Sequence, residues 1–73
     1  MPANLPYAGL AFKGTWDAGT NSPTLTSGAC GTSGDYYVTS AGGSTTLDGI
    51  STWSLGDWAI CGGTGVWTRL GNP

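Results

Sequence analysis

The stretch that most constrains the fold of this chain lies near its C-terminus, between Leu55 and Leu70. Two segments rich in aromatic and aliphatic residues, Trp58–Ile60 and Val66–Leu70, flank a glycine-dense turn at Cys61–Gly65. The second segment consists of residue types that favour strands, and glycine supplies the positive φ angles that tight hairpin turns need. The stretch therefore predicts a C-terminal β-hairpin and, around it, a small all-β module.

The composition disfavours helices of any length. The chain of 73 residues has no Glu or Gln, one Lys and one Met, but 14 glycines, and glycine is among the weakest helix formers. A chain this short forms one domain and buries only about 60% of its unfolded surface, so small folds commonly rely on a disulfide, a metal or oligomerisation. We therefore expect a marginal core that self-association reinforces.

Other segments also have strand character. In the stretch Tyr7–Trp16, the side chains alternate between the two faces of a predicted strand. Lys13 lies on one face, and the other face carries Leu10, Phe12, Gly14 and Trp16. The clearest central strand is 34–40, where Tyr36 and Val38 share one face and Tyr37 and Thr39 the other. Two shorter segments are also candidate strands. Residues 24–26, with Leu25 facing inward, follow a turn signal at 21–23, and residues 45–47 precede a turn signal at Asp48-Gly49.

These segments predict an antiparallel sheet, or a β-sandwich-like module, of about five short strands. Residues 1–8 contain Pro2 and Pro6, which disfavour helix, and are expected to form an extended N-terminal arm. Residues 9–73 are expected to form a single small β domain.

Charge is sparse, with two basic and four acidic residues and a net charge of −2. Such a chain lacks the cluster of basic side chains with which proteins bind nucleic acid or an anionic membrane. No segment is long enough to span a bilayer. The N-terminus lacks the features of a signal peptide, so we expect synthesis in a cytoplasm. An uncharged surface gives weak protection against association, so we also expect a homo-oligomer.

Two cysteines, Cys30 and Cys61, leave two interpretations open. Their pairing cannot be deduced from sequence. Because a reducing compartment keeps thiols free, two free thiols are the favoured expectation and a Cys30–Cys61 disulfide is the alternative. A secreted, disulfide-stapled inhibitor has only this pair in its favour. Two cysteines without histidine do not make a structural zinc site within one chain.

No catalytic constellation is visible in the sequence. There is no histidine to act as a general base, and no serine lies in a nucleophile-elbow pattern. Asp35, Asp48 and Asp57 all lie in turn signals, where an aspartate commonly caps nearby backbone groups. We therefore expect no enzyme activity, no cofactor and no metal.

The tryptophans are the best functional candidates. Because a small domain needs large apolar side chains, most of them are expected to form the core. An aromatic ring left on a β surface can instead stack on a sugar. On this basis the residues favoured for contact with a glycan or a protein partner are Tyr36, Trp53 and Trp67.

An ordered set of short motifs resembles a small module that recurs in virion proteins of tailed bacteriophages, including tail fibres. The motifs cover roughly residues 14–70 and are Gly14-Thr15-Trp16, Asn21-Ser22-Pro23-Thr24-Leu25, Gly34-Asp35-Tyr36-Tyr37-Val38-Thr39-Ser40, Leu47-Asp48-Gly49-Ile50, Gly56-Asp57-Trp58-Ala59-Ile60 and Trp67. Cys61 and the longer turn that follows it depart from the pattern, which makes this hairpin tip the place to look for features peculiar to the chain.

The resemblance implies a structural role on a virion, commonly in trimers, and carries no catalytic residues. Because the chain holds little beyond the module, it favours a stand-alone capsid decoration or head-fibre protein assembled in the host bacterial cytoplasm. Its partners would then be further copies of itself, with a trimer favoured, and virion proteins such as the capsid protein. A carbohydrate-binding or receptor-binding module of a tail fibre is the alternative.

Overall fold

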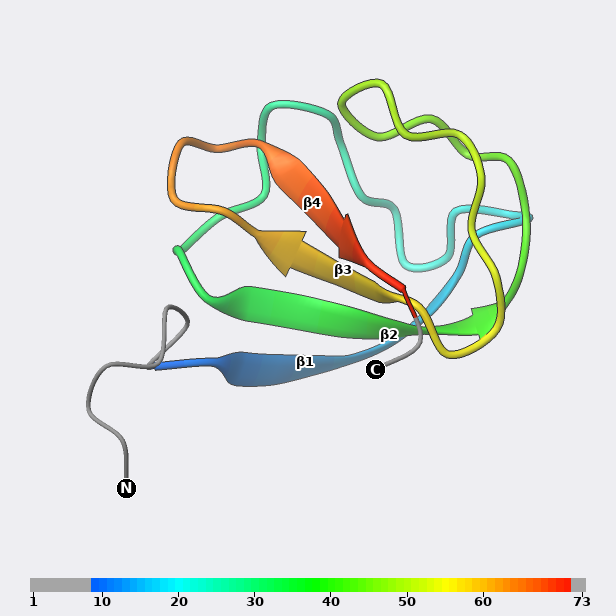
Figure 1. Cartoon of the computed structure of the whole chain (residues 1–73), viewed down its shortest axis with the longest axis horizontal. Helices are drawn as coiled ribbons and strands as arrows, with labels where there is room; N and C mark the ends of the chain where they lie inside the picture. Colours follow the sequence, from blue (N-terminus) through cyan, green and yellow to red (C-terminus); the bar gives the residue numbers. More distant parts are fainter. Residues whose placement is uncertain (1–8, 72–73) are drawn as a thin grey trace.

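The computed structural model describes residues 9–71, and this part of the chain contains strands, turns and loops but no helix. Its strands form one sheet in sequence order (Figure 1): β1 (Ala11–Asp17), β2 (Asp35–Ala41), β3 (Trp58–Cys61) and β4 (Trp67–Leu70). The all-β class predicted from the sequence is confirmed. Among the described residues, therefore, no helix is available to cross a membrane. The N-terminal arm expected at residues 1–8 lies outside the described residues.

The sheet is mixed, which corrects the expected antiparallel arrangement. β1 runs parallel to β2, while β2 and β3 are antiparallel, as are β3 and β4. Parallel neighbours need a crossover connection of about a dozen residues or more. Residues 18–34, expected to hold a short strand, form that connection instead.

The described residues form four strands, not five, and one sheet rather than a sandwich. The segment predicted as a strand at 24–26 does not pair with the sheet because the amide side chain of Asn21 takes the place of a neighbouring strand. Asn21 accepts a hydrogen bond from the Leu25 backbone N–H at 2.9 Å and donates one to the Leu25 carbonyl at 3.0 Å. Leu25 is nevertheless buried, as expected.

The second predicted short strand, 45–47, is reduced to an isolated bridge. Leu47 pairs with Ile50 across the Asp48-Gly49 turn through two backbone hydrogen bonds of 2.9 Å. Asp48 and Gly49 have φ angles of 49° and 87°, the positive values that a two-residue hairpin turn of this kind requires. The turn signal was therefore interpreted correctly, although no strand continues from it.

A bulge in β1 corrects the predicted face of that segment. Phe12 pairs with Tyr36 and Gly14 pairs with Tyr37, so Lys13 is an extra residue without a partner on β2. Gly14 has a φ of 134°, which a side chain rarely tolerates. Because one residue is inserted, Phe12 and Trp16 point to opposite faces of the sheet rather than to the same face.

The C-terminal hairpin and the central strand are confirmed. β3 pairs with β4 in the register Ala59 with Arg69 and Cys61 with Trp67, and β2 lies between β1 and β3. The alternation predicted for β2 also holds, since Thr39 is buried and Tyr37 packs against the core.

The core lies on one face of the sheet, beneath the two long connections, residues 18–34 and 42–57. Each connection contributes apolar side chains to one cluster with the sheet residues: Trp16, Ala18, Leu25, Cys30, Leu47, Trp53, Ala59, Cys61 and Trp67. The Trp16 and Trp53 rings meet edge to face with centroids 4.9 Å apart. One face of the sheet is therefore closed by the chain itself.

Two interactions hold the connections onto this face. A disulfide joins Cys30 in the first connection to Cys61 in β3, with Cα atoms 5.2 Å apart, in place of the two free thiols expected. The Asp48 carboxylate in the second connection accepts hydrogen bonds from the backbone N–H groups of Gly28, at 3.1 Å, and Trp67, at 2.7 Å. Asp48 therefore joins three distant segments rather than capping its own turn, as had been expected.

Breaking the disulfide should cost about 3–4 kcal/mol of unfolding free energy, because the 31-residue separation of its cysteines constrains the unfolded chain. Urea denaturation of the wild type with and without a thiol reductant measures this difference. The Cys30→Ser/Cys61→Ser double variant should be equally destabilised and insensitive to reductant. Equal stability of oxidised and reduced wild type would contradict the expected role of the bridge.

Asp48→Asn should lower the unfolding free energy by about 1–3 kcal/mol, because an amide tolerates the positive φ but loses the charge that strengthens two long-range hydrogen bonds. Asp17→Asn is the matched control. Asp17 caps Gly19 and Thr20 in its own turn, so its change should stay within about 0.5 kcal/mol. Chemical denaturation of both variants compares them, and equal effects would contradict the role given to Asp48.

Candidate contact surface

Two of the three side chains predicted to contact a ligand or partner are in the core. Trp53 and Trp67 are each 3% exposed. Their indole N–H groups donate to the carbonyls of Thr45 and Thr26, each at 2.9 Å. In this conformation neither ring can reach a ligand. The prediction is corrected for both because the long connections, which the sequence left as loops, fold over them.

Tyr36 lies on the opposite, open face of the sheet and is half-buried there. It is the middle member of a row of aromatic rings that crosses three strands. Its ring centroid is 5.6 Å from that of Phe12 in β1 and 4.3 Å from that of Trp58 in β3. Tyr36 and Trp58 stack with an interplanar angle of 9°. We call Phe12, Tyr36 and Trp58 the aromatic ladder.

The ladder continues into an apolar surface that spans the whole sheet. Leu70 in β4 lies opposite Trp58 and is 41% exposed, while Phe12 at the other edge is 57% exposed. Between them Val38 is half-buried, and Ile60, opposite Tyr36, is buried although it does not belong to the core cluster. The row is apolar from edge to edge, with exposed side chains at its two ends and partly exposed rings between them, which makes it a candidate contact surface.

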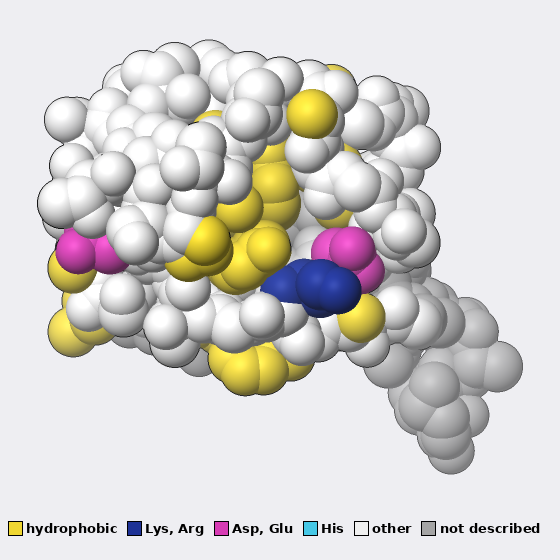
Figure 2. Space-filling model, turned by 180° about the vertical axis from the view of Figure 1, so that it is seen from behind, with side chains coloured by type: hydrophobic (Ala, Val, Ile, Leu, Met, Phe, Trp, Pro, Cys, Tyr) yellow, Lys and Arg dark blue, Asp and Glu magenta, His cyan; other side chains and the backbone are white. Residues whose placement is uncertain are grey.

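This face carries no charged side chain on β2, β3 or β4, and the charged residues of β1 are Lys13 in the bulge and Asp17 at the end of the strand. On β2, β3 and β4 its members alternate along each strand, and they are Tyr36, Val38, Ser40, Trp58, Ile60, Thr68 and Leu70. On β1 they are Phe12 and Thr15, because the bulge brings Thr15 into register with Val38. The low charge extends beyond this face. Figure 2, the view from behind, shows a largely uncharged surface with basic and acidic side chains in small patches.

The two edges of the sheet are protected in different ways. β1 carries the bulge, with Lys13 as the extra residue, and bulges and lysines on edge strands hinder pairing with another chain. On β4, the register directs the backbone N–H of Trp67 outward, where the Asp48 carboxylate accepts its hydrogen bond. Strand-to-strand association is therefore disfavoured at both edges.

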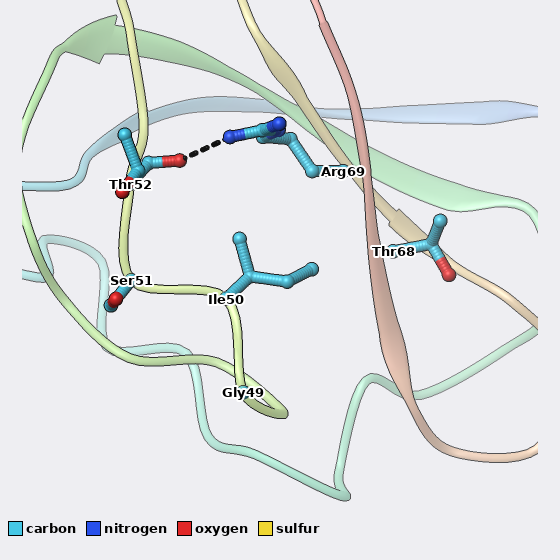
Figure 3. Close-up of a pocket in the computed structure, with 6 residues that line it drawn as sticks. All are labelled: Gly49, Ile50, Ser51, Thr52, Thr68 and Arg69. Atoms are coloured by element: carbon cyan, nitrogen blue, oxygen red, sulfur yellow. Dashed lines mark hydrogen bonds between the residues drawn. The ribbon is translucent and has the colours of Figure 1, made fainter.

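A shallow, open hollow of about 420 Å³ lies beside β4 (Figure 3), between Gly49–Thr52 and the Thr68–Arg69 segment. The Arg69 guanidinium extends over it and donates to the Thr52 carbonyl at 2.7 Å. In Figure 3 the side chains of Ser51 and Thr68 point away from Arg69. The hollow therefore lacks convergent polar groups, and Arg69 serves to tie the second connection to the edge strand.

Three of the four aspartate side chains accept hydrogen bonds from the backbone. Asp17 and Asp48 accept the backbone hydrogen bonds described above, and Asp57 accepts one from the Ser54 N–H at 2.8 Å. Within residues 9–71, no three histidine, cysteine, aspartate or glutamate side chains lie close enough together to hold a metal ion. The hairpin tip, expected to be distinctive, is joined to Cys30 at two points. Cys61 forms the disulfide with Cys30, and the Gly65 carbonyl accepts a hydrogen bond from the Cys30 backbone N–H.

Phe12 and Trp58 complete the ladder but were missed as site residues. A signal for Trp58 was present, because it is three positions from Cys61 and must face away from it within a strand. The orientation of Phe12 depends on the bulge at Lys13, which alternation cannot reveal.

Comparison of the chain with known proteins identifies no relative. No family model matches it, and no curated protein or solved structure is similar to it. Function must therefore be inferred from the surface and from the sequence motifs.

Trp67→Ala should cost about 3–5 kcal/mol of unfolding free energy because it removes a buried ring and leaves a cavity. Trp58→Ala should cost only about 1–2 kcal/mol, since half-buried Trp58 loses mainly its stack with Tyr36. Urea denaturation followed by circular dichroism measures both. A larger loss for Trp58→Ala than for Trp67→Ala would contradict the assignment of the two rings to open face and core.

Proposed function

We propose that this chain is a non-catalytic structural protein of a bacteriophage virion, a capsid decoration or head-fibre protein that works as a homo-oligomer. The observation that carries the proposal is the aromatic ladder, an uncharged apolar row on the face that the connections leave open. A surface of this kind suits protein packing, because it offers no convergent acid, base or nucleophile. A trimer is the state we favour, following the phage module that the sequence resembles.

The placement on a virion rests on the sequence motifs, and several residues of these motifs have framework roles. Trp16 and Trp67 lie in the core, Asn21 satisfies the backbone of Leu25, and Asp48 joins the connections to β4. A shared set of framework residues supports a shared fold. The partners proposed on this basis are further copies of the chain and the capsid protein, with assembly in the host bacterial cytoplasm.

The disulfide is compatible with this location. Cytosolic proteins rarely keep disulfides, whereas particle surfaces outside the cell do. The Cys30–Cys61 bridge would therefore close after release into an oxidising medium. The mature particle would then carry the more stable form of the module.

Glycan binding is the second candidate, as for a receptor-binding module of a tail fibre. It is favoured by the partial exposure of Tyr36 and Trp58, since aromatic rings can stack on sugars. However, these two rings stack on each other with nearly parallel planes, so one face of each ring is already covered and less ring surface remains for a sugar. Packing against protein therefore has the stronger support.

Purified virions of the phage that encodes the chain should contain it in many copies per particle. Quantitative mass spectrometry of gradient-purified particles measures the copy number, and immunogold microscopy with an antiserum against the chain locates it, with the head surface as the expected site. Label on tail fibres would favour the receptor-binding alternative. Absence of the chain from washed, infectious particles would contradict the proposal.

A further inference from the structure

We infer that the aromatic ladder is the surface through which one copy of this chain packs against a second copy, an inference that rests on the proposed function and names the partner of its contact surface. The surface comprises Phe12, Tyr36 and Trp58 together with Leu70, one residue from each strand of the sheet. Leu70 lies opposite Trp58 in the β3–β4 register. The row therefore crosses the sheet without a gap.

The geometry of the rings favours a protein surface as the occupant. Tyr36 and Trp58 are stacked with centroids 4.3 Å apart, and Phe12 is tilted by 49° against Tyr36. Such a row presents a ridge rather than a flat platform of coplanar rings. Side chains of another sheet can pack along a ridge, as the facing sides of two sheets do in protein cores.

The low charge of the chain is compatible with a second copy as the partner. Phe12, Tyr36, Trp58 and Leu70 and the residues that alternate with them on β2, β3 and β4 carry no charge, so two copies that meet through this row bury no unpaired ion within it. A strongly basic or acidic partner would find no opposite charge on this surface. A contact between the same patch on two chains is isologous and closes a dimer, whereas in the trimer favoured above the ladder would pack against a different patch of the next copy.

The edges of the sheet remove the main competing mode of association. β1 is interrupted by its bulge at Lys13, and the outward Trp67 N–H of β4 is already bonded to Asp48. Strand-to-strand extension of the sheet is therefore hindered at the bulge and at the start of β4. Contact through the open face remains, and it buries the large side chains Phe12 and Leu70, which are 57% and 41% exposed in one copy.

The contact should be weak between two isolated copies. The four strands of the sheet span only about 14 Å across at the usual spacing of about 4.8 Å, which is small for a stable interface of about 800 Å² per partner. A dissociation constant of about 10–100 μM is therefore expected in solution. On a particle, many copies held close together would raise the effective concentration and strengthen the contact.

Sedimentation equilibrium over about 5–500 μM, with the disulfide intact, tests this inference. The wild type should shift from monomer to a defined homo-oligomer, and Phe12→Ser/Leu70→Ser should weaken association at least tenfold. Leu55→Ser is the matched control, because Leu55 is 68% exposed but lies in a turn outside the strands that carry the ladder. It should associate like the wild type. Circular dichroism and urea midpoints establish that the variants are folded.

Two outcomes would overturn the inference. One is a wild type that stays monomeric up to 500 μM. The other is a Phe12→Ser/Leu70→Ser variant that associates as strongly as the wild type. If the monomeric wild type still binds particles and the double variant does not, the ladder instead contacts another virion protein. The self-association is then wrong while the virion role stands. If the chain is absent from virions but self-associates through the ladder, the virion role fails and the contact surface remains.

Discussion

The fold depends on how the two long connections are held against one face of a small sheet. Four short strands cannot enclose a core by themselves, and most of the apolar cover comes from Leu25, Cys30, Leu47 and Trp53 in loops. Loops without regular pairing lose much conformational entropy when they become ordered. The disulfide to Cys61 and the Asp48 carboxylate offset that loss, because each links segments that are far apart in the sequence.

Closing one face in this way leaves the other face free. The connections are committed to the core side, the edges are hindered by the bulge and by Asp48, and the ladder of Phe12, Tyr36 and Trp58 stays partly exposed. If copies associate as proposed, stability and association use opposite sides of the same sheet. A chain of this size gains by such a division, since further copies can bury the apolar surface that its own loops do not reach.

The sequence predicts the parts of the structure that depend on local pattern. The C-terminal hairpin, the alternation of Tyr36 to Thr39 and the Asp48-Gly49 turn all follow from short-range chemistry. The parallel pairing of β1 does not, because it depends on a long crossover. Most tryptophans are expected in the core, but Trp53 and Trp67 remain candidates for contact in the sequence because nothing local shows which loops cover a ring. The ladder was found only at Tyr36, since the bulge at Lys13 decides the direction of Phe12.

The four indole N–H resonances in a proton–nitrogen NMR spectrum, followed as the protein is concentrated, test the central claim most directly. The indoles of Trp16, Trp53 and Trp67 are hydrogen-bonded to Asn21, Thr45 and Thr26, whereas among the described residues the Trp58 indole has no acceptor. If the core and the association surface lie on opposite faces of the sheet, the Trp58 signal should shift with protein concentration. The other three signals should stay fixed, and their N–H protons should exchange slowly with solvent. A fixed Trp58 signal, or concentration-dependent shifts at the three bonded indoles, would contradict it.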